Sequence, residues 1–330
     1  MAILASMLAQ GAQMFLVLGI APLVTGLTRL TKARLMRRRG PPLLQGYRDL
    51  ARLLRKEAVL ADNASWLFRA APYAIFSLTW VACALVPTFA TGLMFNWAAD
   101  VIALVAILGA ARALLALAGM DVGTSFGGIG SSREMMIASL AEPAMLLVVL
   151  TMALAAGSTR LPEVAGFFLE QPLAIRVSLA LALAALCIVA LAENARIPVD
   201  NPATHLELTM VHEAMVLEYS GRHLAMVEAA SQLKLVLYLS LIACLFFPFG
   251  MVEVENGPLA WFQSVGLYLV KIATGAIALG VWELSIAKMR VFRVNEFLGA
   301  AFIFAFLAIL LTFLTQELLP QGVVSPRGLQ

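Results

Sequence analysis

Residues 224–249 read LAMVEAASQLKLVLYLSLIACLFFPF. This apolar stretch is long enough to cross a bilayer, because a transmembrane helix needs about 20 mostly apolar residues. The whole chain has the same character, since 62% of its residues are hydrophobic and 13% are charged, against about 45–50% and about 25% in soluble domains. The sequence therefore predicts an all-α integral membrane protein. The low charge excludes a disordered chain and a nucleic-acid-binding protein.

Seven further segments have spanning length, so we expect eight transmembrane helices. No internal repeat or linker divides the chain, and we expect a single transmembrane domain over residues 1–330. The eight expected spans are Met7–Leu27, Phe68–Phe89, Ala98–Ala118, Met136–Ala156, Leu173–Ala192, Leu224–Phe249, Leu259–Ile286 and Phe297–Leu319. Three cysteines lie far apart inside these apolar runs, as core residues do: Cys83, Cys187 and Cys244.

Lys and Arg residues gather on one side of the expected spans. Most of the 23 fall in the connections that follow the first, third, fifth and seventh spans. The positive-inside rule then places these connections in the cytoplasm and both termini outside. We expect a multi-pass protein of the plasma (inner) membrane, with its main cytoplasmic loops at about residues 28–67 and 193–223.

The first loop begins with the helix-breaking run RRRGPP at residues 37–42. In residues 43–56, apolar positions follow a helical stripe and Arg and Lys occupy the other positions, which predicts an amphipathic helix on the membrane surface. Its cations suit anionic lipid headgroups or a soluble partner protein, and the pattern alone favours lipid.

The second loop is rich in ionisable residues. Residues 193–202 read ENARIPVDNP, and residues 204–218 mix further acids and histidines with apolar residues, which indicates partial burial against another surface. His205 and His212 stand seven residues apart, whereas the zinc motif H-E-x-x-H needs four. We therefore expect no metal site. No catalytic-triad spacing and no phosphate-binding glycine loop occurs in the sequence.

Ionisable residues also lie in or beside the spans. Each costs about 2.5–3.5 kcal/mol at a helix centre, so these residues cannot face lipid. Paired charges that fix helix packing would explain them structurally. An ion or proton path would explain them functionally, because burial can shift the pKa values of such groups by several units. We expect an ion-coupling chain, graded from the second loop toward the membrane centre, of Glu142, Glu193, Glu228, Lys234 and Lys271.

Several of these residues stand in motifs. An R-R-G-P turn begins at Arg38, a Gly128–Arg133 run leads to Glu142, and the pattern E-x-x-R-x-P-x-D starts at Glu193, followed by Glu207-Leu208 and by EYSG at residues 218–221. Over essentially its whole length the chain resembles the membrane subunit shared by respiratory complex I (subunit 1, or H subunit) and the group 4 membrane-bound [NiFe] hydrogenases. It is most similar to the formate hydrogenlyase branch, of the hydrogenase-4 component C type.

The resemblance implies a membrane-anchoring, ion-coupling and non-catalytic subunit of an oxidoreductase complex. The expected partners are hydrogenase large and small subunits, iron–sulfur subunits, antiporter-like membrane subunits and the lipid bilayer. We expect the [NiFe] centre and the iron–sulfur clusters in those partners, and no cofactor or metal in this chain. The resemblance places the interface with the redox module at Arg38, Arg39, Arg133, Arg196, Asp200, Glu207 and Glu218.

Departures from the family pattern favour a hydrogenase-type complex over a quinone-reducing one. Val199 stands where the family has Phe, and Ala203 and His205 replace two of three alternating acids, which leaves only Glu207. The expected function is to link electron transfer in a [NiFe] hydrogenase or formate hydrogenlyase-like complex to proton or sodium translocation. Two alternatives stay open: the quinone-site subunit of a proton-pumping NADH:quinone oxidoreductase, and a stand-alone secondary transporter, against which the lack of a repeat counts.

Overall fold

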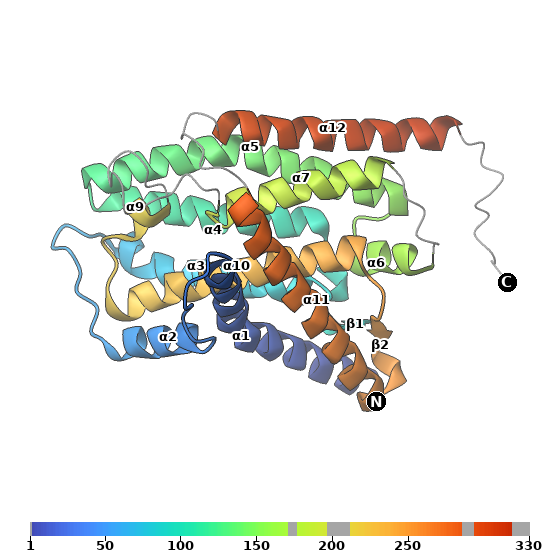
Figure 1. Ribbon diagram of the computed structural model, residues 1–330, viewed down its shortest axis with the longest axis horizontal. Coiled ribbons are helices and arrows are strands. Elements are labelled where there is room, and N and C mark those ends of the chain that lie inside the picture. Colours follow the sequence, from blue (N-terminus) through green and yellow to red (C-terminus); the bar gives the residue numbers. More distant parts are fainter. Residues whose placement is uncertain (1, 171–176, 197–211, 286–293, 319–330) are drawn as a thin grey trace.

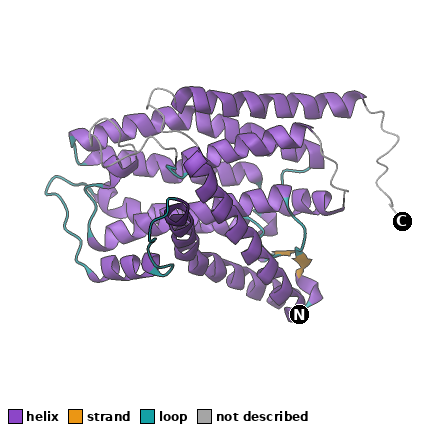
Figure 2. Cartoon of the chain, in the orientation of Figure 1, coloured by secondary structure: helices purple, strands orange, loops and turns teal. Residues whose placement is uncertain are grey.

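The computed structural model describes residues 2–170, 177–196, 212–285 and 294–318, and nearly all of the described chain is helical (Figure 2). In this part, seven helices are long and apolar enough to cross a membrane, which confirms an all-α membrane protein. They are α1 (Ala2–Leu35), α3 (Trp66–Leu85), α4 (Val101–Asp121), α5 (Ser125–Ala156), α10 (Gly221–Phe246), α11 (Pro258–Ser285) and α12 (Val294–Leu318).

The remaining expected span, Leu173–Ala192, falls on α7, the apolar helix Val177–Glu193 of 17 residues. The predicted start of that span, Leu173, lies outside the described residues, so a count of eight stays a prediction. Helix ends differ from the expected bounds where polar residues continue a helix. The fifth helix begins eleven residues before Met136, because the Thr124 hydroxyl caps it by accepting from the Gly127 N–H at 3.2 Å.

Short elements occupy the connections. They are α2 (Gln45–Arg55), α6 (Leu161–Glu170), α9 (His212–Val216), the 3₁₀ turns η1 (Met94–Trp97) and η2 (Val254–Asn256), and the strands β1 (Ala90–Thr91) and β2 (Val252–Glu253). The two strands pair in parallel, with Ala90 opposite Val252. The second helix lies within the segment where an amphipathic helix was expected. It packs against α1 and α10, and Tyr47 donates a hydrogen bond to the carbonyl of Gly19.

The helices form an elongated bundle (Figure 1). Along one edge α12 packs on α5 and α7, and along the opposite edge α1 packs on α2. Between them lie α3, α4 and α10, while α11 crosses the bundle obliquely and packs on α1 and α10. We refer to the end with α2 and α9 as the loop end, and to the end with β1 and β2 as the strand end.

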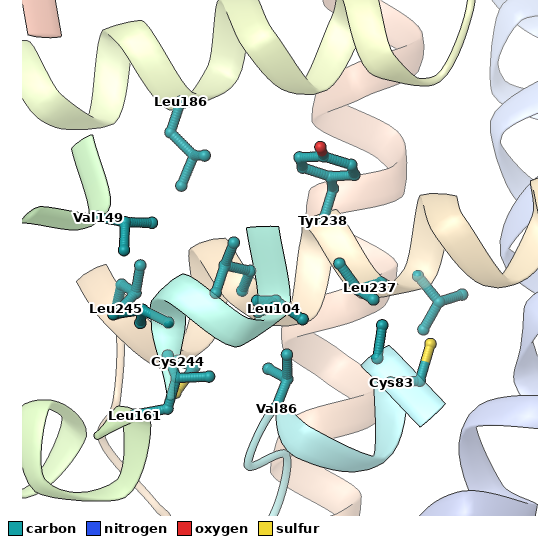
Figure 3. Packing of buried hydrophobic residues seen from close by; sticks show 14 of the residues in the cluster. Cys83, Val86, Leu104, Val149, Leu161, Leu186, Leu237, Tyr238, Cys244 and Leu245 are labelled. Atoms are coloured by element: carbon teal, nitrogen blue, oxygen red, sulfur yellow. The ribbon is translucent and has the colours of Figure 1, made fainter. Parts of the chain in front are cut away.

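The main core is a continuous cluster of buried aliphatic side chains from the central helices. Figure 3 shows part of it, with Cys83 and Cys244 among leucines and valines, and with Tyr238 aiming its hydroxyl toward the helix that carries Leu186. Cys83 and Cys244 are buried and free, as expected of core cysteines, whereas Cys187 is only half-buried. This packed region fixes the relative positions of α4, α5, α7 and α10.

A close contact between two glycines joins α4 to α5. A Cβ atom at Gly127 would lie 2.0 Å from the carbonyl oxygen of Gly119, so no other residue fits at position 127 without a shift of the backbone. Seven residues, or two helical turns, separate Gly119 from Arg112, and the same number separates Gly127 from Glu134. In this antiparallel pair the glycine contact therefore brings Arg112 and Glu134 to the same level.

Candidate functional site

Arg112 is the hub of a buried ion cluster, which consists of Arg112, Glu134, Glu142, Glu193 and Lys234. Its side chain is 2% exposed. The Nε atom lies 3.4 Å from Oε1 of Glu134, Nη1 lies 3.5 Å from Oε1 of Glu142, and Nη2 contacts Oε2 of Glu193. One guanidinium of α4 thus faces three carboxylates from α5 and α7. The planar fork of arginine suits this task, because it presents several N–H groups in fixed directions.

Lys234 of α10 completes the cluster, since its Nζ atom lies 2.8 Å from Oε2 of Glu193. The carboxylate at the end of α7 is therefore shared by two cations. Among the residues that the structure describes, two cations of the cluster face three carboxylates, which leaves one excess negative charge in a largely buried place. Among the three carboxylates, Glu142 has the most exposed side chain, at 41% against 11% for Glu134 and 4% for Glu193.

A second ion group is centred on Glu283 of α11. Its Oε2 atom lies 2.5 Å from Nζ of Lys32 on α1, and its Oε1 atom lies 2.9 Å from Nη1 of Arg196, just after α7. The Glu283 side chain is 4% exposed. These pairs tie together three helices that are far apart in the sequence.

A polar cavity of ≈ 440 Å³ lies between the Glu283 group and α10. Its wall carries three basic residues, three acidic residues and one histidine: Arg29, Lys32, Arg196, Glu213, Glu228, Glu283 and His212. The mixture of signs distinguishes it from an ordinary apolar ligand pocket. Glu228, on α10, is half-buried in this wall.

A smaller cavity of ≈ 50 Å³ lies beside both the polar cavity and the ion cluster. It is lined by Glu193 and Lys234 of the cluster, and it shares wall residues with the polar cavity: Asn194, Ala195, His212, Val227 and Ser231. A water molecule needs only about 10–15 Å³ of such space. Polar side chains and room for water thus lead from the loop end to the Glu193–Lys234 pair.

His212 of α9 lines both cavities. Burial lowers the pKa of its imidazole. Glu134 opposes this effect, whereas Lys234 and Arg112 add to it. The imidazole is therefore neutral at pH 7 and can accept a proton. Its place beside both cavities makes it a candidate proton carrier between them.

The structure brings together three of the five residues expected to couple ion movement, namely Glu142, Glu193 and Lys234. Glu228 lies on the wall of the polar cavity. Lys271 lies elsewhere, because its ammonium donates to the carbonyls of Phe247, at 2.7 Å, and Phe249. These carbonyls follow the C-terminal end of α10, at the strand end.

The expected interface residues lie mainly at the loop end. Arg38 and Arg39 are exposed between α1 and α2, Glu218 is half-buried between α9 and α10, and Arg133 is half-buried on α5. Arg196 is bound to Glu283, and Asp200 and Glu207 fall outside the described residues. The two loops meet where the Ser220 hydroxyl bonds both backbone groups of Val59 at 2.8 Å.

Sequence reasoning missed the central role of Arg112 and did not identify Glu134. Lys32 and Glu283 were not among the expected site residues. A signal for Glu134 exists, because residues 134, 138, 141 and 142 lie on one helical face. Extending the span toward Ser125 would have placed Glu134 and Glu142 together.

Comparison with known proteins shows the family of the chain. The sequence profile of the NADH dehydrogenase family matches residues 9–314. Formate hydrogenlyase subunit 4 of Escherichia coli (strain K12) is 32% identical over 296 residues, covering 90% of this chain and 95% of that protein. Hydrogenase-4 component C of the same strain is 32% identical over 297 residues, covering 90% and 93%.

The fold also matches a solved structure. A chain of the membrane-bound sulfane sulfur reductase, an archaeal respiratory membrane complex, superimposes with a TM-score of 0.78. The match covers 94% of this chain and 99% of that one, at 18% sequence identity. At that identity the likeness shows a shared fold.

Proposed function

This chain belongs to the NADH dehydrogenase family and is a membrane subunit of a complex I-like oxidoreductase, and from that premise we propose a hydrogenase-type role. In this proposal it anchors the soluble module of a [NiFe] hydrogenase or formate hydrogenlyase-like complex in the plasma membrane. It also links electron transfer in that module to the movement of protons or sodium ions. The redox centres belong to the partner subunits.

The observation that carries the coupling role is that the small cavity shares wall residues with the polar cavity and is lined by two residues of the ion cluster. Both cavities share His212 and Asn194, and the smaller one ends at Glu193 and Lys234. A charge that arrives at the loop end during electron transfer changes the field at these groups, because electrostatic effects are strong in a low-dielectric interior. In response, a carboxylate of the ion cluster gains or loses a proton.

The orientation and the partners are part of the same proposal. We place α7 as an eighth span. An even number of spans returns the chain to the side of its N-terminus, so that both termini lie outside. The loop end then faces the cytoplasm, where the iron–sulfur and hydrogenase subunits are. The antiporter-like membrane subunits receive the coupled charge from the ion cluster.

Purification of the tagged chain in mild detergent tests the anchoring role. We expect nickel- and iron–sulfur-containing proteins to come with it, and recovery of the chain alone contradicts the proposal. The coupling role is tested with Glu193→Gln in the assembled complex, where we expect hydrogen turnover to continue and ion movement to stop. Glu163→Gln is the matched control, because Glu163 pairs with Arg160 on the surface with 51% of its side chain exposed.

Quinone reduction is a second candidate, favoured by one observation. The polar cavity, at ≈ 440 Å³, lies within the usual range of about 300–1,000 Å³ for small-molecule sites. Inhibitors that compete with quinone separate the two roles, because they arrest a quinone reductase and leave hydrogen turnover by a hydrogenase unchanged.

A further inference from the structure

An apolar groove of ≈ 520 Å³ lies between α7, α10 and α11. It begins at Asn194 and Leu235, which also line the polar cavity, and runs toward the strand end as far as Phe247 and Phe249. Both α7 and α11 pack on α10. The groove is therefore a furrow with α10 as its floor, and it runs along the apolar helices α10 and α11.

The size of the groove fits one hydrocarbon chain. On α11 its lining extends from Leu267 to Trp282, a distance of about 22 Å at a rise of about 1.5 Å per residue. Sixteen methylene groups occupy roughly 430 Å³ at about 27 Å³ each in a packed interior. A helix of the same length and a diameter of about 10–12 Å needs roughly 2,000 Å³. The groove can therefore hold an alkyl chain, whereas a helix could only cover it.

Among the described residues that line this groove, Lys271 is the one that carries a charge. Its ammonium uses two N–H groups on the carbonyls of Phe247 and Phe249 and lies 4.3 Å from the centre of the Phe249 ring. Within the described residues, no carboxylate lies within 4 Å of it. Hydrogen bonds between an ammonium and an anion are among the strong ones, and one N–H of the ammonium remains to bind an anionic oxygen.

The position of Lys271 suits a lipid headgroup. Its ammonium sits at the C-terminal end of α10, which has 26 residues, or a length of about 39 Å. That length exceeds the hydrocarbon thickness of about 30 Å. The strand end of α10 therefore lies close to a membrane face, where phosphate groups are, and not at the midplane.

We propose that this groove binds one acyl chain of an anionic phospholipid, whose phosphate pairs with Lys271. The chain fills the furrow between α7 and α11, and the phosphate supplies the missing counter-charge. The inference does not depend on hydrogenase activity, because it rests on the groove and the lysine alone.

Native mass spectrometry of the purified, delipidated full chain tests this site. The probes are phosphatidylglycerol and phosphatidylcholine with identical acyl chains, and inorganic phosphate alone. We expect phosphatidylglycerol to bind about tenfold more tightly than phosphatidylcholine. The phosphate of phosphatidylglycerol carries a net negative charge that can pair with the ammonium, whereas choline neutralises the phosphate of phosphatidylcholine. Lys271→Gln removes this preference and Lys271→Arg keeps it. Binding of inorganic phosphate with equal affinity contradicts the proposal.

A second variant tests the groove independently of the charge. Thr274→Trp places an indole in the lining and should lower the binding of both lipids at least tenfold. Ile277→Trp is the control, because Ile277 is 44% exposed on the same helix and outside the groove. Unchanged lipid binding in Thr274→Trp, or equal binding of the two lipids by the unaltered chain, overturns the proposal.

Discussion

Oε2 of Glu193 lies 2.8 Å from Nζ of Lys234, so the end of α7 is tied to α10 inside the membrane domain. The same carboxylate contacts Arg112, which extends the tie to α4. Because Glu193 contacts cations of α4 and α10, a change in its charge acts on three helices at once. Glu193 also lines the small cavity. In the proposed coupling role, both helix packing and ion movement depend on this carboxylate.

Lys234→Met should destabilise the chain by about 3 kcal/mol, because it leaves a buried carboxylate with one cation where it had two. Detergent unfolding of the purified chain, followed by circular dichroism, measures the loss. Glu193→Gln combined with Lys234→Met should cost at least about 1 kcal/mol less than the sum of the single changes, since the two side chains interact directly. Strictly additive effects would show that the pair contributes nothing.

Gly127→Ala should separate α4 from α5 and destabilise the ion cluster. Its new Cβ atom would lie 2.0 Å from the Gly119 carbonyl oxygen, and that oxygen belongs to the backbone and cannot rotate away. We expect a loss of at least about 2 kcal/mol in the same unfolding measurement. Gly128→Ala is the matched control, because nothing lies within 4 Å of its Cβ position. That change should be neutral or gain up to about 1 kcal/mol from helix propensity.

The fold followed largely from the sequence because a bilayer imposes a simple requirement. Every spanning backbone must satisfy its own hydrogen bonds, so long apolar runs become helices. Residues 224–249 therefore predicted α10 to within about three residues at each end. Polar extensions such as the start of α5 at Ser125 were missed, because hydropathy does not detect a helix that is stabilised by packing on its neighbour.

The site was predictable only in part, because hydropathy shows which charges are buried and not which ones meet. Glu193 and Lys234 were expected to act together, and they do form a pair. Lys271 was grouped with them by its depth along α11, but the oblique course of that helix carries its ammonium to the strand end (Figure 1). Helix tilt depends on tertiary packing, which one sequence does not reveal.

Stability should fall as the pH drops below the ordinary pKa of histidine, owing to His212. Burial lowers the pKa of this imidazole in the folded chain, whereas the unfolded chain has the ordinary value of about 6.5. The unfolded state therefore binds more protons in this range, so the contribution is present above about pH 6.5 and is lost toward the lower folded value. Thermal unfolding at pH 5 to 8 measures this dependence.

His212→Gln is the variant that isolates this effect. It keeps a polar side chain beside the two cavities and cannot take up a proton, so its unfolding temperature should vary less between pH 5 and pH 7 than that of the unaltered chain. An identical pH profile in the variant would assign the dependence to other groups, such as the carboxylates of the polar cavity.

Arg38→Glu with Arg39→Glu should weaken the attachment of the soluble redox module without preventing membrane insertion. Both side chains are exposed at the loop end, so their charges are available to an acidic partner surface. Reversing two charges at an interface makes attraction into repulsion and costs several kcal/mol. Co-purification of the module with the tagged chain measures the loss, which should be at least tenfold.

Arg160→Glu is the control for this reversal. Arg160 is also exposed, with 57% of its side chain accessible, but it pairs with Glu163 after α5, toward the strand end. It should leave attachment unchanged. The attraction should also weaken between about 50 and 300 mM salt in the unaltered chain, since screening shortens the reach of exposed charges to about 8 Å near 150 mM. Retention of the module by the double Arg variant at every salt concentration would place the docking surface elsewhere.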